Sequence, residues 1–298
     1  MPTNLPKSTA ILSKRPSETA FNHKNIVGQS PLTRPTMTEQ DKRWQIHRHL
    51  AQDTDERLQI VRHAPKRVLL VGADADISRS LLAARYPNAV FEEYDPRADF
   101  LQTATAARKS GFWQKLTGKT VPQHCQALTD PLPEACADML WANLSLPRAD
   151  EILPVLQNWA NALKTDGLLF FTHFGRDSLT ELTGRLKSAG IACETPTLID
   201  MHDLGDMLAD NGFYDPVTDT AKLELSYRKA ATFRQDMETL GLWHALKFSD
   251  AQAAEAFVDK IFETEGGLTV TLETVYGHAV KKLTLPEGEN VVRFYPKG

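Results

Sequence analysis

One glycine and three aspartates lie where a nucleotide-binding loop is expected, within residues 67–96 (RVLLVGADADISRSLLAARYPNAVFEEYDP). An apolar run ends at Gly72, the loop carries Asp74 and Asp76, and a second apolar run ends at Asp95. A carboxylate at the end of the second strand, roughly 20 residues beyond the glycine, can accept hydrogen bonds from both hydroxyls of an adenosine ribose. The spacing fits nucleoside binding, and it fits equally an acid that only begins a turn before the following proline.

The two aspartates of the loop bear on the kind of cofactor. Phosphates bind the backbone N–H groups of a helix N-terminus, and like charges a few ångströms apart repel by on the order of 1–4 kcal/mol. Asp74 and Asp76 therefore argue against a cofactor that carries phosphate. S-adenosylmethionine has a sulfonium and an ammonium against one carboxylate and no phosphate, so it is compatible with this loop.

Alternating apolar and amphipathic segments must position these residues. The runs at 67–71, 138–146 and 167–174 have the length and composition of buried strands, and helical patterns separate them. This alternation predicts an α/β fold with a parallel sheet, which places ligands at the carboxyl ends of its strands. In the last third, two strands of alternating polarity flank a helical insertion at about 228–266, which predicts an antiparallel edge and a helical lid.

Two aspartates are predicted to begin helices. Asp177 precedes an amphipathic segment and is well placed as its N-cap. The motif DMHDLG at residues 200–205 places a histidine beside an aspartate, but adjacent residues do not face each other on a helix. We therefore predict a structural motif in which Asp200 or Asp203 caps the helix.

Composition restricts the class of protein. The 298 residues carry a formal charge of −4 and are 42% hydrophobic, as is usual for a globular protein with no general attraction to nucleic acid. No apolar run approaches the length of a membrane span, so we expect no membrane partner. The three cysteines lack the spacing of a zinc site or a disulfide framework, so we expect no metal and a cytoplasmic location.

Residues 1–40 differ from the rest of the chain. They are rich in Pro, Ser, Thr and Asn, and such a segment does not bury enough apolar surface to offset its ordering entropy. We predict a disordered tail over 1–40 and one domain over 41–298. The first 36 residues are also basic and poor in acids, which leaves a targeting presequence as the alternative.

Four downstream segments carry a resemblance to a known family. They read ANLSL, GLLFFTHFGRDSLTEL, DMHDLGDMLADNGFYDPV and VYGHAVKK, and the likeness runs from about residue 43 to 282. The chain resembles the malonyl-[acyl-carrier protein] O-methyltransferases (BioC), which are class I methyltransferases of biotin synthesis. The same segments look like a related mitochondrial complex I assembly factor thought to hydroxylate an arginine. The resemblance implies a Rossmann-like fold and S-adenosyl-L-methionine as cofactor.

The resemblance also implies cofactor-binding positions at the strand ends, and these are Gly72, Asp74, Asp95, Gln126 and Asn143. The family has glycines at 74 and 76, and side chains there cost roughly 1–2 kcal/mol of strain. Gln126 takes the place of an acid that receives the adenine amino group, and its carbonyl can accept that bond. One hypothesis is that Asp74 or Asp76 pairs with the ammonium or sulfonium. The alternative is a pseudoenzyme that has lost cofactor binding and acts through protein contacts.

The implied substrate is the free carboxylate of malonyl-acyl carrier protein. This carboxylate is ionised at pH 7, so methyl transfer needs orientation and fixed hydrogen-bond donors rather than a general base. Arg148 and Arg176 follow the third and fourth strands and are the candidates to bind it. Acyl carrier proteins are acidic, and Arg228, Lys229 and Arg234 in the insertion are the candidates to contact this partner.

Overall fold

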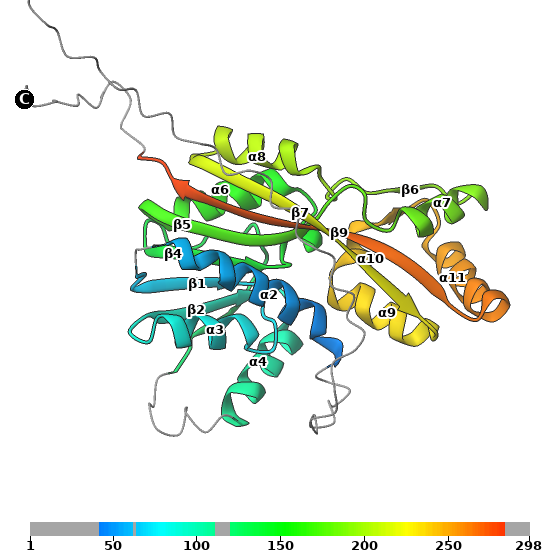
Figure 1. Ribbon diagram of the computed structural model, residues 1–298, viewed down its shortest axis with the longest axis horizontal. Coiled ribbons are helices and arrows are strands. Elements are labelled where there is room, and N and C mark those ends of the chain that lie inside the picture. The colour runs from blue at the N-terminus through cyan, green and yellow to red at the C-terminus, as the bar shows by residue number, and fades with distance from the viewer. Residues whose placement is uncertain (1–41, 62–63, 111–119, 284–298) are drawn as a thin grey trace, which may run out of the picture. The chain divides into compact units, whose positions relative to one another are not determined.

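Seven strands form one sheet in the computed structural model, which describes residues 42–61, 64–110 and 120–283 (Figure 1). Their order is β3-β2-β1-β4-β5-β9-β7; the first five are parallel, and β9 pairs antiparallel with β5 and β7. The bounds are β1 (Arg67–Val71), β2 (Val90–Asp95), β3 (Gln123–Cys125), β4 (Ala137–Asn143), β5 (Leu163–Phe174), β7 (Phe213–Tyr227) and β9 (Leu268–Lys281). The predicted α/β fold with an antiparallel edge is confirmed.

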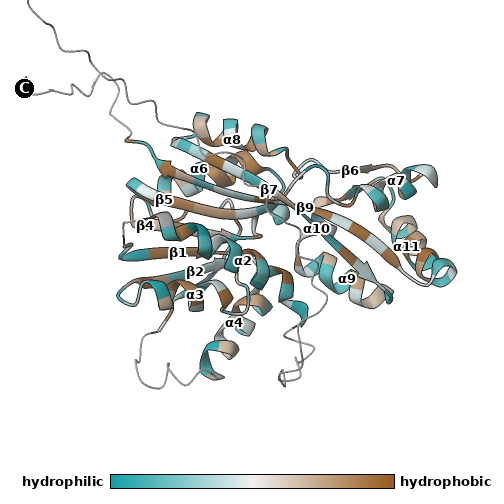
Figure 2. Ribbon diagram, viewed as in Figure 1, coloured by the Kyte–Doolittle hydropathy of each residue, from teal (hydrophilic) through white to brown (hydrophobic). Residues whose placement is uncertain are grey.

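Helices cover both faces of the parallel strands because successive strand side chains point to opposite sides. In β1, Val68 and Leu70 belong to one core cluster, and Leu69 and Val71 belong to another. The first cluster includes residues of α2 (Gln45–Arg57), α3 (Ile77–Arg85) and α4 (Ala98–Ser110), and the second includes residues of α6 (Ile152–Ala162) and α8 (Met201–Asp210). Figure 2 shows the apolar residues of the strands between these helices.

The antiparallel strands carry a third core. Residues 268–273 of β9 pair with β7 but not with β5, so the pair continues past the parallel strands. Around it pack α7 (Thr180–Ser188), α9 (Ala230–Thr239), α10 (Leu242–Ala245), α11 (Ala251–Glu265) and the short strands β6 (Cys193–Glu194) and β8 (Lys247–Phe248). Helices α9 to α11 lie between β7 and β9 in the chain, as expected for the helical insertion.

The two predicted helix caps have different outcomes. Asp200 caps α8, because its carboxylate accepts a hydrogen bond from the backbone N of His202 at 2.8 Å. The predicted cap at Asp177 is wrong, since α7 begins only at Thr180. The backbone from Gly175 to Leu179 instead hydrogen-bonds to β9, through Glu273 O and Thr271 O, and this pairing delays the start of the helix.

Three further expectations concern the chain as a whole. The predicted tail over 1–40 lies outside the described residues. No helix in the described ranges has both the length and the apolar character needed to span a bilayer. In the same ranges, no group of three or more His, Cys, Asp or Glu residues is placed to hold a metal ion.

Candidate cofactor and substrate site

The carboxyl ends of β1, β2 and β4 bring four of the five predicted cofactor residues together, namely Gly72, Asp74, Asp95 and Asn143. The backbone N of Gly72 donates to Tyr94 O at 2.8 Å, and the next backbone N, of Ala73, donates to Oδ2 of Asp95 at 2.8 Å. A Cβ atom added to Gly72 would lie 3.2 Å from Asn143 O. Gly72, Asp95 and Asn143 therefore lie side by side, as the parallel register requires.

Gly72 is the position at which the loop needs a glycine. Its φ is +100°, a conformation that residues with a side chain rarely adopt. A Cβ would also meet the Cβ of Ser145 at 3.2 Å, in addition to the carbonyl of Asn143. The close approach of three backbone segments at this point explains the single glycine that the loop retains.

Asp74 points into the protein and supports the loop. Its side chain is buried and accepts hydrogen bonds from Ser78 N at 3.1 Å, Ser78 Oγ at 2.6 Å and Asn143 Nδ2 at 2.8 Å. Burial raises the pKa of this carboxyl group, and the bonds from Ser78 and Asn143 oppose the rise. These contacts join the first turn of α3 to the end of β4; a direct contact of Asp74 with a cofactor stays a prediction.

Asp76 is held by two arginines. Ala75 and Asp76 both have left-handed backbone conformations, with φ of 56° and 69°, which carry strain in residues other than glycine. The carboxylate of Asp76 contacts Arg79 Nε at 2.6 Å and Arg108 Nη1 at 2.9 Å. Arg108 also bonds to the buried Glu93 at 2.9 Å. The ion pairs of Asp76 stabilise a loop conformation that its sequence disfavours.

Asp95 is buried, and its hydrogen-bonding positions are used within the chain. Oδ1 accepts from the backbone N and Nε of Arg97 at 2.7 and 2.8 Å, and Oδ2 accepts from Arg97 Nη2 at 2.8 Å as well as from Ala73 N. Arg97 was missed in the sequence analysis. The signal that could have found it is an arginine two residues after a strand-end acid, at a turn.

Unpartnered polar atoms lie near this loop. Among the described residues, buried side-chain atoms without a hydrogen-bond partner include Ser145 Oγ, His47 Nδ1 and Trp44 Nε1. Ser145 adjoins Gly72, and the backbone O of His47 accepts a bond from Asn143. Burial, with smaller effects of nearby arginines, lowers the pKa of His47 to about 3, so its imidazole is neutral at pH 7. These unpartnered atoms could hydrogen-bond to a polar ligand.

The remaining predicted residues lie in different surroundings. Gln126 follows β3 and donates a hydrogen bond to Asp130 O at 3.3 Å. Arg148 has a side chain only 19% exposed and contacts Glu238 of α9 at 3.0 Å. Arg176 is 62% exposed and contacts Asp203 of α8 at 2.8 Å. Arg148 therefore contacts the helical insertion, whereas Arg176 contacts α8, so the two arginines have different partners. The catalytic role of each stays a prediction.

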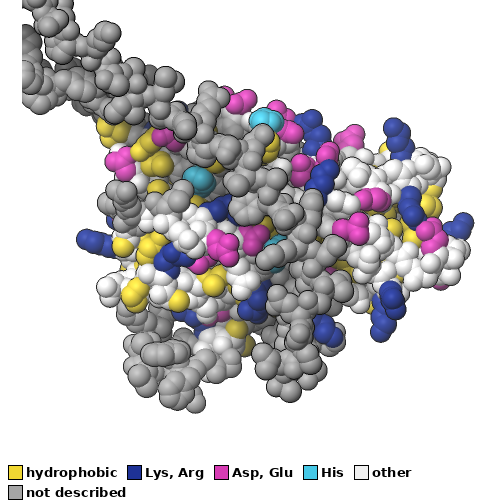
Figure 3. Space-filling view, viewed as in Figure 1, with side chains coloured by type: hydrophobic (Ala, Val, Ile, Leu, Met, Phe, Trp, Pro, Cys, Tyr) yellow, Lys and Arg dark blue, Asp and Glu magenta, His cyan; other side chains and the backbone are white. Residues whose placement is uncertain are grey.

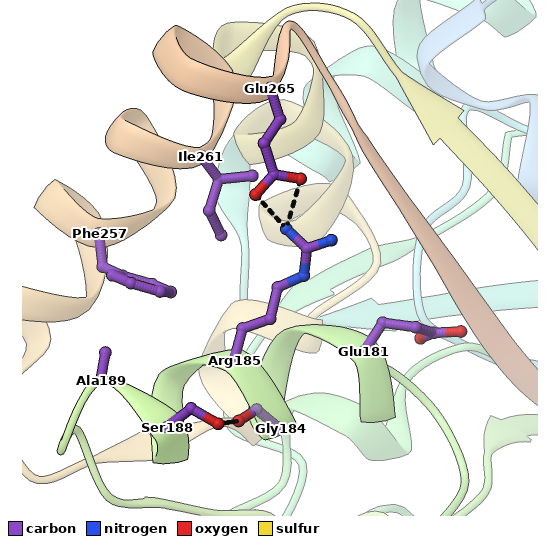
Figure 4. Close-up of a pocket in the computed structure, with 8 residues that line it drawn as sticks. All are labelled: Glu181, Gly184, Arg185, Ser188, Ala189, Phe257, Ile261 and Glu265. Atoms are coloured by element: carbon purple, nitrogen blue, oxygen red, sulfur yellow. Dashed lines mark hydrogen bonds and ion pairs between the residues drawn. The ribbon is translucent and has the colours of Figure 1, made fainter.

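Of two hollows in the described part of the protein, one lies at the site and the other does not. One of about 190 Å³ lies beside the loop and is bordered by Ala75 and Asp76. The other, a groove of about 590 Å³ between α7 and α11, is crossed by an ion pair from Arg185 to Glu265 (Figure 4). The residues that line this groove include none of the predicted cofactor or substrate residues.

Comparison with known proteins identifies relatives along most of the chain. A malonyl-[acyl-carrier protein] O-methyltransferase of Laribacter hongkongensis is 31% identical over 266 residues, which are 84% of this chain and 89% of the relative. One of Gallionella capsiferriformans is 32% identical over 235 residues, 76% of this chain and 80% of the relative. No family model matches the chain.

Solved structures of low identity share the fold. A Bacillus halodurans protein assigned to the methyltransferases has a TM-score of 0.53 at 12% identity, over 78% of this chain and all of that chain. The YcgJ protein of Bacillus subtilis has a TM-score of 0.51 at 14% identity, over 79% of this chain and 99% of that chain. Both support the Rossmann-like arrangement of the sheet and helices.

Proposed function

Because the chain belongs to the malonyl-[acyl-carrier protein] O-methyltransferase family, we propose that it methylates the free carboxylate of malonyl-acyl carrier protein in biotin synthesis. The observation that carries this proposal is the match to relatives of that name over four fifths or more of their length. The adjacent Gly72, Asp95 and Asn143 at the strand ends support it, because class I methyltransferases bind their cofactor at this edge.

The chain is an S-adenosyl-L-methionine-dependent methyltransferase, and its residues fit that cofactor. We propose that Gly72, which has no side chain at the strand ends, faces the ligand, and that Asp95 accepts hydrogen bonds from the ribose hydroxyls once the guanidinium of Arg97 moves away. Asn143 and Gln126 would complete the site, with Gln126 as acceptor for the adenine amino group. When bound, the cofactor supplies an electrophilic methyl group. The imidazole of His47 is neutral at pH 7, so it would not repel the sulfonium of the cofactor.

The substrate carboxylate needs a partner that orients it. Arg148 is the stronger of the two candidates, since its side chain is mostly buried between the strand ends and α9. A guanidinium in such a place can bind a carboxylate through two parallel hydrogen bonds and replace its water. No side chain has to remove a proton, because the attacking oxygen is already ionised.

The insertion is the proposed contact surface for the carrier protein. Arg228 and Lys229 are exposed next to α9, whereas Arg234 lies on α9 and pairs with Asp259 of α11. Figure 3 shows basic and acidic side chains interspersed on the visible face of the protein. We therefore assign the contact with the carrier protein to Arg228 and Lys229 rather than to a broad basic patch. The expected location of the protein is the cytoplasm.

Methylation of purified malonyl-acyl carrier protein tests the proposal. The full chain with S-adenosyl-L-methionine should add one methyl group to the malonyl carrier, detected by mass spectrometry, and should leave acetyl-carrier protein unchanged because it lacks the free carboxylate. Arg148→Met should lower kcat/KM by about 10- to 100-fold, the loss expected for a charged hydrogen bond. Arg176→Met tests the other candidate, and a loss smaller than that of Arg148→Met would support the choice of Arg148.

The names of the relatives do not favour the pseudoenzyme alternative. It predicts no methylation of the malonyl carrier and no rescue of a biotin-requiring strain, although the protein is folded. Methylated product would refute it. The names of the relatives do not favour the arginine-modifying assembly factor.

A further inference from the structure

Arg97 connects the carboxylate of Asp95, the predicted ribose acceptor, to the insertion. Its guanidinium makes two hydrogen bonds to Asp95, lies 3.4 Å from the ring centroid of Phe100, and contacts Thr239 O at 3.4 Å. The side chain is only 11% exposed. Thr239 is the last residue of α9, so one side chain touches both the predicted cofactor site and the helical lid.

Two further arginines bind the same end of α9. Arg43 Nε donates to Thr239 Oγ1 at 3.0 Å, and Arg148 Nη1 contacts both the carboxylate and the backbone O of Glu238, at 3.0 and 3.4 Å. Cations at a helix C-terminus are favourable because the helix dipole places negative charge there. Residues from three separate segments thus hold the last turn of α9 against the carboxyl edge of the sheet.

The geometry of Asp95 makes its bonds mutually exclusive with those of a ribose. A carboxylate has about four acceptor positions, and Asp95 receives four N–H groups: two from the guanidinium of Arg97 and two from the backbone of Ala73 and Arg97. The backbone N–H groups belong to the turns that follow β1 and β2, whereas the guanidinium ends a side chain that can rotate away. Two ribose hydroxyls therefore have to take the positions of the guanidinium.

We propose that Arg97 sets the affinity for the nucleoside cofactor, by occupying the ribose positions of Asp95, and that its displacement loosens the last turn of α9. This inference rests on the cofactor named in the proposed function. The two sites are coupled reciprocally: cofactor binding weakens the hold on the insertion, and a partner that moves α9 eases cofactor binding. The carrier protein of the substrate would bind at the insertion. The coupling would therefore link the binding of the carrier protein to the binding of the cofactor.

Calorimetric titration of S-adenosylhomocysteine into the full chain and its variants tests the affinity. Arg97→Ser removes the competing guanidinium and should lower Kd by about tenfold or more, the effect of one or two charged hydrogen bonds. Arg97→Lys retains a positive charge but cannot form two parallel hydrogen bonds, so its Kd should lie between those of the wild type and Arg97→Ser. Arg85→Ser is the matched control, because Arg85 of α3 forms an equally bidentate pair with Asp55 of α2, and neither residue is a predicted cofactor residue. It should leave Kd unchanged.

Hydrogen–deuterium exchange of residues 230–240 tests the coupling. Exchange should increase when S-adenosylhomocysteine binds the wild type, and it should be high in Arg97→Ser before ligand is added. Equal or weaker binding by Arg97→Ser in a protein with native circular dichroism overturns the inference, as does exchange that falls on binding. If wild type and variant both fail to bind, the cofactor assignment falls with it. Tight binding without methylation refutes only the proposed substrate.

Discussion

Loss of Arg108 should strongly destabilise the protein without touching the proposed substrate. Its side chain is 4% exposed and pairs with Asp76 at 2.9 Å and with Glu93 at 2.9 Å. Arg108→Met fills a similar volume but leaves the buried Glu93 without the cation it pairs with, whereas Asp76 keeps its ion pair with Arg79. Removing one partner of a buried ion pair costs about 3–5 kcal/mol, so we expect a loss of unfolding free energy in that range.

The pH dependence identifies the cause of that loss. Burial already raises the pKa of Glu93, and Arg108 opposes the rise; without Arg108 the pKa should rise further. A carboxyl group whose pKa is higher in the folded than in the unfolded state favours folding at low pH and loses this contribution as pH rises through the folded pKa. The deficit of Arg108→Met should therefore shrink as pH falls from 7 towards 5, and Glu93→Gln should restore part of it at pH 7.

Urea unfolding at several pH values measures these quantities. Arg185→Met is the control, since Arg185 and Glu265 form an exposed pair and such pairs contribute about 1 kcal/mol or less. A loss below about 1 kcal/mol for Arg108→Met would refute the argument. So would a deficit that is independent of pH, because the unpaired charge would then not be its source.

Three other predictions follow from the same contacts. Gly72→Ala forces a side chain to φ +100° and against Asn143 O, so we expect about 1–3 kcal/mol of destabilisation in thermal unfolding and a higher Kd for S-adenosylhomocysteine. Asp200→Ala removes the cap of α8 and should cost about 1 kcal/mol, while Asp200→Asn retains most of it. His47 has a pKa lowered to about 3, so its contribution to stability is present above its unfolded pKa and is lost as pH falls below it, with a slope approaching about 1.4 kcal/mol per pH unit. His47→Gln should remove this slope in denaturant titrations between pH 6 and 4.

Local patterns in the sequence were sufficient to predict the scaffold. The apolar runs that end at Gly72 and Asp95 are the strands β1 and β2, because a strand buried on both faces has a composition readable without its neighbours. The carboxyl ends of parallel strands share one edge, so the proximity of Gly72, Asp95 and Asn143 followed from topology. The capping role of Asp200 depends only on adjacent residues.

Only the tertiary structure showed which ion pairs form around the predicted site. Asp76 meets Arg108 across 32 positions, and Arg148 meets Glu238 across 90. Such pairs have no periodicity, since they depend on how separate elements pack. The sequence therefore determined which edge of the sheet gathers the predicted cofactor residues and which acid ends its second strand. Only the tertiary structure showed that Arg97, which also contacts Phe100 and the end of α9, pairs with Asp95. The direction of a guanidinium depends on the side chains that pack around it, and these come from separate segments.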